Sequence, residues 1–192
     1  MTISTKDRIL DAAEELMLTK SFHSVGLAEI LAAVKVPKGS FYHHFRSKEQ
    51  FGVELISHYV KGHTACLEKF SATPNIKALQ KLVDYWGYQI GQVTTSDCKE
   101  CCLVVKLSLE VANFSEPMRA ALAEGLKTWR AIYESLVREG QSDRSIRKEL
   151  DPVEAAAAIQ DTWQGAMQRM QVERSVAPLR SAAQFLRSFL AV

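Results

Sequence analysis

Three of the four cysteines fall within five residues, at Cys98, Cys101 and Cys102. They lie in a turn before an expected helix, where the helix dipole favours a thiolate and so makes a thiol reactive. A structural zinc site needs four ligands, and there is no second pair of Cys or His at zinc-finger spacing. We therefore expect no metal and no cofactor, and the cysteines are either reactive thiols or ordinary helix-end residues.

A second group of chemically active side chains is basic. Between Lys35 and Lys48 the chain carries four Lys and Arg residues and two histidines, and no acid occurs before Glu49. The whole chain has 24 Lys and Arg against 22 Asp and Glu, a formal net charge of +2. The balance excludes a uniformly basic nucleic-acid coat, but a local patch of this kind favours contact with a polyanion such as DNA.

The basic stretch coincides with a helix, a short turn containing Pro37 and a second short helix, the spacing of a helix–turn–helix motif. The second helix of such a motif places its first side chains at the bases in the major groove. The candidate base-reading residues are Lys38, Gly39 and Ser40, and the candidate phosphate-contacting residues are Tyr42, His44 and Lys48, with added positive charge from His43. The alternative is a tight turn between packed helices with a solvated basic rim.

The elements that must position these residues all read as helices, so we predict an all-α fold. Apolar residues recur at helical spacing, and no segment shows the period of a strand. The predicted helices cover residues 5–20, 27–34, 38–45, 48–70, 75–95, 103–113, 115–140, 151–170 and 176–190. We predict a DNA-binding domain over 1–47 and an effector-binding and dimerisation domain over 48–192. The last two helices carry apolar seams suited to close antiparallel packing.

The composition indicates an ordinary globular protein, with 47% hydrophobic and 24% charged residues. No apolar run approaches the roughly 20 residues that a bilayer span requires, and the first residues lack the apolar region of a signal peptide. We therefore expect a cytoplasmic protein without a membrane partner.

Aromatic and amide side chains are spread over three of the later helices and could line a cavity for a small molecule. The candidates are Tyr85, Tyr88, Gln89, Trp129, Arg130, Tyr133 and Trp163. For any one of these aromatics, filling the core is the simpler interpretation. Arg130 stands apart, because a buried guanidinium would require an anion such as a carboxylate.

The segment from Pro37 to Glu49, read as Pro-Lys-Gly-Ser-Phe-Tyr-His-His-Phe-Arg-Ser-Lys-Glu, resembles the DNA-binding signature of the tetracycline-repressor (TetR) family. The resemblance extends over the whole chain. It implies a homodimer, formed through the last two helices, that binds double-stranded operator DNA and is released by an effector. It also implies a transcriptional regulator, most simply a repressor, rather than an enzyme.

The segment from Cys101 to Val111 is similar to a subgroup of that family that includes the repressor of N-ethylmaleimide reductase and an acrylate-responsive regulator. Its electrophile-sensing members use a cysteine at the position of Cys102, so the resemblance implies a thiol sensor here. The lysine paired with that cysteine aligns with Gln171, which argues against a cysteine–lysine switch and leaves Cys98 or Cys101 as a resolving thiol. A purely non-covalent ligand and a thiol-dependent enzyme using Cys102 remain the alternatives.

Overall fold

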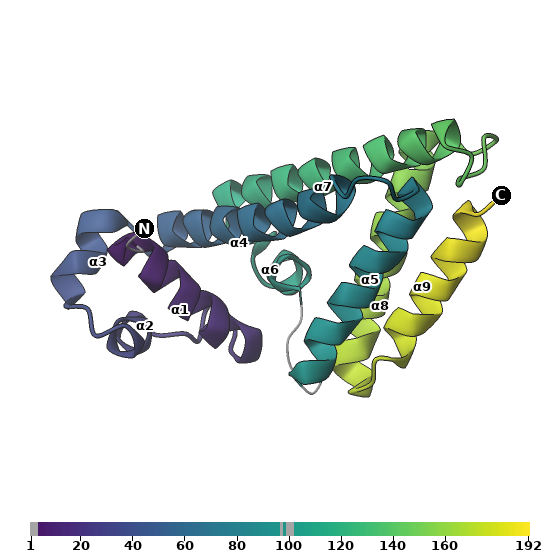
Figure 1. The fold of residues 1–192 in the computed structure, drawn as a ribbon. Coiled ribbons are helices and arrows are strands. Elements are labelled where there is room, and N and C mark those ends of the chain that lie inside the picture. The colour runs from purple at the N-terminus through teal and green to yellow at the C-terminus, as the bar shows by residue number, and fades with distance from the viewer. Residues whose placement is uncertain (1–3, 97, 99–101) are drawn as a thin grey trace. The chain divides into compact units, whose positions relative to one another are not determined.

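The computed structural model describes residues 4–96, 98 and 102–192. Within these ranges it contains nine helices and one isolated bridge, between Ile146 and Ala191, which confirms the all-α prediction. The helices are α1 Thr5–Thr19, α2 Leu27–Ala33, α3 Lys38–His44, α4 Lys48–Ser71, α5 Ala78–Thr95, α6 Leu103–Val111, α7 Glu116–Ser142, α8 Pro152–Glu173 and α9 Ala177–Leu190 (Figure 1). No helix among the described residues is long and apolar enough to cross a membrane.

The chain forms two compact units, and the two long helices α4 and α7 contribute to both. The first unit, 1–62 with 103–125, contains α1 to α3, most of α4, α6 and the start of α7. The second unit, 63–102 with 126–192, contains the end of α4, α5, most of α7, α8 and α9. The division after residue 47 stays a prediction about which segment contacts DNA.

An aromatic cluster forms the core of the first unit. Phe41, Phe45 and Phe51 are at most 2% exposed, and their ring centroids lie 4.9 to 5.3 Å apart. The cluster joins α3 to the start of α4, whose first turn is capped because Ser47 Oγ accepts from the Gln50 amide at 3.0 Å. This packing fixes the direction in which α3 presents its outer face.

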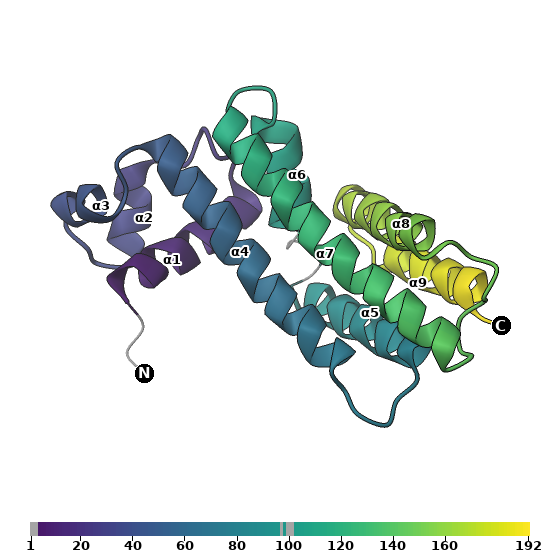
Figure 2. The same ribbon diagram turned by 90° about the horizontal axis from the view of Figure 1, so that it is seen from above.

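The second unit packs α5, α8 and α9 together, as Figure 2 also shows. Trp86 of α5 is fully buried, and its ring stacks on Trp163 of α8 with centroids 6.1 Å apart. The helix α8 begins where Asp151 accepts from the amides of the first turn and Pro152 occupies the first helical position.

The start of α5 differs from the prediction by three residues. Asn75 has a φ of 59°, in the left-handed region, so the helix cannot begin there. It begins at Ala78, whose amide donates to Asp143 Oδ2 across 2.8 Å. The cap is thus supplied from 65 residues further along the chain.

Candidate functional site

The helix–turn–helix consists of α2 and α3, joined by a turn in which Lys35 adopts a φ of 55°. Phe41 points into the core, whereas the other face of α3 is open. Lys38, Gly39 and His43 are exposed there, and Tyr42 is 56% exposed. The short helix can therefore offer one face to DNA while the opposite face holds it in place.

Lys48 makes intramolecular contacts that the sequence did not suggest. Its Nζ donates to the carbonyl oxygens of His23 and Val25 at 3.3 and 3.1 Å, and lies 5.3 Å from the ring centroid of Phe22. The side chain is still exposed. Lys48 thus supports the turn that leads into α2, in addition to the phosphate contact that we predict for it.

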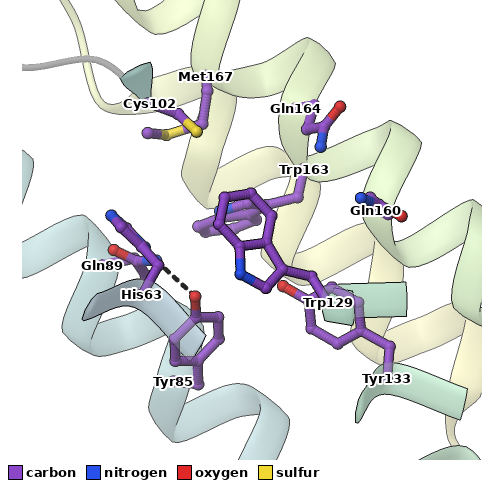
Figure 3. A pocket seen from close by; sticks show the side chains of 10 residues that line it. All are labelled: His63, Tyr85, Gln89, Cys102, Trp129, Tyr133, Gln160, Trp163, Gln164 and Met167. Atoms are coloured by element: carbon purple, nitrogen blue, oxygen red, sulfur yellow. Dashed lines mark hydrogen bonds between the residues drawn. The ribbon is translucent and has the colours of Figure 1, made fainter. Parts of the chain in front are cut away.

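A small cavity lies in the second unit and is lined by side chains from four helices and by Cys102 (Figure 3). Its volume is about 30 Å³, which is room for only a few water molecules. The lining residues are His63, Tyr85, Gln89, Cys102, Trp129, Tyr133, Gln160, Trp163, Gln164 and Met167. The structure thus brings together six of the eight predicted effector residues.

Two tyrosines and an amide form a hydrogen-bonded group at the cavity. Gln89 Nε2 donates to the hydroxyl oxygen of Tyr85 across 2.7 Å. Burial raises the pKa of both Tyr85 and Tyr133, and the side chains of the two tyrosines are also hydrogen-bonded to each other. Since the amide nitrogen of Gln89 can only donate, the Tyr85 hydroxyl keeps its own proton for a different acceptor.

Four lining residues lie outside the eight predicted ones: His63, Gln160, Gln164 and Met167. His63 comes four residues after the buried Tyr59, so continuing the apolar face of α4 would have found it. Burial lowers the pKa of His63 to about 4, which keeps the imidazole neutral at neutral pH. Gln160 precedes Trp163 by three residues on the same face of α8 and is 2% exposed.

Two of the predicted effector residues lie outside the lining. Tyr88 is 43% exposed and contacts the ring of Phe70, with centroids 5.4 Å apart. Arg130 is exposed, and its Nε donates to the side-chain oxygen of Gln160 at 2.9 Å. The premise of a buried guanidinium that needs an anion is therefore wrong, because solvent and an amide satisfy this side chain.

The cysteines differ in their surroundings. Cys102 is 8% exposed and immediately precedes α6, in agreement with the predicted position at a helix start. Cys98 is buried, and its carbonyl oxygen accepts from Arg174 at 3.2 Å. Cys66 is half-buried, and burial raises the pKa of its thiol. Cys101 lies outside the described residues, and those residues contain no cluster of three or more potential metal ligands.

Comparisons with known proteins agree with this arrangement. Residues 9–55 match the family of bacterial regulatory proteins called tetR, and residues 76–186 match the tetracyclin repressor-like C-terminal domain. The HTH-type transcriptional repressor NemR of Escherichia coli strain K12 is 32% identical over 97% of this chain and 94% of its own. The transcriptional regulator AcuR of Cereibacter sphaeroides is 33% identical over 94% of this chain and 81% of its own.

Two solved structures extend the comparison to the fold. The crystal structure of the reduced form of E. coli NemR gives a TM-score of 0.89 at 30% identity and covers 98% of both chains. A regulatory protein TetR from Rhodobacter sphaeroides gives a TM-score of 0.90 at 31% identity, covering 96% of this chain and 98% of that one.

Proposed function

The chain belongs to the TetR family of bacterial transcriptional regulators, and we propose that it is a dimeric repressor released from its operator by a small uncharged electrophile. Regulators of this family bind operator DNA and typically dimerise. The proposed effector is a compound that reacts with the Cys102 thiol. The proposal rests on one observation, that the Cys102 thiol lines a cavity together with hydrogen-bonding groups that carry no charge.

The lining argues against an acidic or cationic effector. None of the described side chains around the cavity is Asp, Glu, Lys or Arg, and His63 is neutral at neutral pH. A carboxylate placed there would lose its hydration without gaining a counter-ion, which is strongly unfavourable. The small volume further requires a compact effector or a cavity that opens around it.

A conjugated carbonyl compound fits both the thiol and the tyrosine. The sulfur of Cys102 would bond to the β-carbon, and the π electrons of the C=C bond would move toward the carbonyl oxygen. The Tyr85 hydroxyl would donate to that oxygen as charge develops on it. The proton lost by the thiol ends on the α-carbon, so the addition needs no oxidant, reductant or leaving group.

The adduct distinguishes this function from the alternatives. A sensor consumes one electrophile per chain, whereas a thiol-dependent enzyme would turn over repeatedly and regenerate its thiol. A non-covalent ligand would act equally on a chain that lacks the thiol. The aromatic walls supplied by Trp129 and Trp163 favour the non-covalent route as the second candidate.

We assign the dimer contact to α8 and α9. Phe185 of α9 is 56% exposed and stacks with Phe189 at 6.1 Å between centroids, and Val172 of α8 is 83% exposed. Exposed aromatic and aliphatic side chains on adjacent helices are typical of a surface that a partner covers. In such a dimer the two DNA-binding heads, each formed by α1 to α3, would meet major grooves about one helical turn, roughly 34 Å, apart.

The test is DNA binding with and without thiol modification. The protein should retard DNA from upstream of its own coding sequence, and N-ethylmaleimide should abolish the shift. Cys102→Ser should bind the same DNA and remain bound in the presence of the reagent. Normal release of the Cys102→Ser protein would reject the covalent trigger, and no shift of any palindromic fragment at low salt would reject DNA binding.

A further inference from the structure

The carbonyl oxygens at the end of α1 are partnered by a side chain from another helix. The last turn of a helix leaves carbonyl oxygens without partners and carries partial negative charge, so a cation there is stabilising. In α1 the last turn contains no Lys, Arg or His, and a side chain from α6 supplies the cation instead. Lys106 Nζ donates to the carbonyl oxygens of Met17, Leu18 and Lys20 at 2.7, 3.3 and 3.0 Å.

One turn further along α6, the carboxylate of Glu110 binds the segment that follows α1. Glu110 Oε2 accepts from the backbone amide of Phe22 across 2.7 Å. Lys106 and Glu110 are four residues apart and therefore lie on one face of α6. Both are only partly exposed, which strengthens their hydrogen bonds relative to those of a fully solvated pair. Lys106 as a donor and Glu110 as an acceptor thus hold the backbone between Met17 and Phe22 against α6.

The loop that Lys106 and Glu110 hold leads directly into the helix–turn–helix. It covers residues 20–26, between the end of α1 and the start of α2 at Leu27. Lys48 of α4 holds its far end through the carbonyl oxygens of His23 and Val25. The position of the start of α2 is therefore fixed by side chains of α4 and α6 as well as by packing among α1, α2 and α3.

At its other end α6 is tied to the cavity. Its first residue, Leu103, follows Cys102 directly in the chain. One peptide bond therefore links a residue of the cavity wall to the helix that carries Lys106 and Glu110. One residue of helix rises about 1.5 Å, and a displacement of that size along the axis breaks contacts that are 2.7 to 3.3 Å long.

We propose that Lys106 and Glu110 are positioning residues that carry the state of the effector cavity to the DNA-binding head, by holding the 20–26 loop to α6. The inference rests on the proposed function, because it concerns how modification of Cys102 is transmitted. In this mechanism two polar side chains of α6 transmit the change, which packing alone would not do.

The experiment measures coupling, defined as the ratio of the DNA dissociation constants of the modified and unmodified protein. A C66S/C98S/C101S background leaves Cys102 as its single thiol, and N-ethylmaleimide is the probe. The background protein should show a ratio of at least about tenfold. Lys106→Met and Glu110→Met should reduce this ratio below about threefold, because each removes one side-chain partner of the loop, and Lys106→Arg should leave the ratio near its starting value. Leu109→Gln is the matched control, because Leu109 is on α6 and 76% exposed.

The outcomes separate the two proposals. No release of the background protein after complete modification of Cys102 rejects the sensor. Equal release of that protein and of Lys106→Met and Glu110→Met rejects the role of Lys106 and Glu110 in transmission but does not affect the proposal that Cys102 is the sensor. Each variant is first checked for equal modification of Cys102 by mass spectrometry.

A second measurement needs no change in α6, so it remains decisive where a variant does not fold. Modification should speed hydrogen exchange of the backbone amides over 20–26 in the background protein, because the Phe22 amide loses its acceptor. The same exchange with and without the adduct, in a protein that does release DNA, would overturn the proposal.

Discussion

Gln89 donates a hydrogen bond to the hydroxyl oxygen of Tyr85 across 2.7 Å, at the wall of a cavity that a cysteine thiol also lines. The two residues are one turn apart on α5, so the bond survives small changes in the neighbouring helices. It fixes the orientation of the phenol and leaves the phenolic proton directed to another acceptor. The pair gives the cavity a hydrogen-bond donor that stays uncharged, because burial raises the pKa of Tyr85.

The first prediction concerns this donor. Tyr85→Phe should slow the reaction of Cys102 with N-ethylmaleimide by about tenfold, the value of one hydrogen bond to a developing oxyanion. The rate is followed by mass spectrometry of the intact protein. Iodoacetamide reacts by displacement without forming an enolate, so its rate should change much less. Tyr88→Phe is the control on the same helix, since Tyr88 is 43% exposed and outside the cavity; equal slowing in both variants would remove the special role of Tyr85.

The second prediction concerns pH and stability. Burial lowers the pKa of His63 to about 4, against about 6.5 in the unfolded chain, so below pH 6.5 the unfolded state binds more protons. The contribution of the neutral His63 imidazole to the free energy of unfolding is therefore fully present above about pH 6.5. It is lost as the pH falls toward 4, which lowers that free energy by up to about 3 kcal/mol. His63→Gln should reduce the slope of the unfolding free energy against pH between pH 4.5 and 7, as measured by urea unfolding. A slope equal to that of the unmodified protein would contradict a neutral imidazole at this position.

Much of this arrangement was accessible from the sequence because its signals are local. The caps at Ser47 and Asp151 and the turn before α3 each depend on residues within one or two turns of a helix. The start of α5 was not accessible, because its cap comes from Asp143. Nor was the role of Lys106, whose acceptors lie 86 to 89 residues earlier in the chain. Periodicity identifies which face of a helix is buried but not which distant backbone atoms a polar side chain on that face will meet.

The third prediction separates the residues that read bases from those that contact the backbone of DNA. Lys38→Ala should change the order of preference among operator variants, because a lysine at the start of α3 can donate to guanine in the major groove. Tyr42→Phe should weaken all sequences alike. A panel of single-base operator variants measured by fluorescence anisotropy checks both. An unchanged order of preference in Lys38→Ala would contradict its base-reading role.

Lys48 should behave differently from both, because it has two tasks. Lys48→Met should reduce the slope of log K against log salt by about one unit if one phosphate contact is lost. It should also lower the melting temperature, since the carbonyl oxygens of His23 and Val25 lose their donor. A lower slope at an unchanged melting temperature would show that the intramolecular contacts contribute nothing to stability.

The last prediction tests the packing that supports the head, with two glycines of α4. A Cβ at Gly52 would lie 2.6 Å from Met118 Cε and 2.8 Å from Phe22 Cζ, closer than real contacts allow. Gly52→Ala should therefore destabilise the protein by about 1 to 3 kcal/mol, the usual result of overpacking. At Gly62 the added carbon would meet no atom within 4 Å among the described residues beyond its chain neighbours and the local backbone of α4, so Gly62→Ala should be neutral or raise stability by up to about 1 kcal/mol through helix propensity. Urea unfolding of both variants checks the difference. Equal stabilities would mean that Met118 and Phe22 move aside freely, and the turn next to Phe22 would then be looser than its contacts with Glu110 and Lys48 indicate.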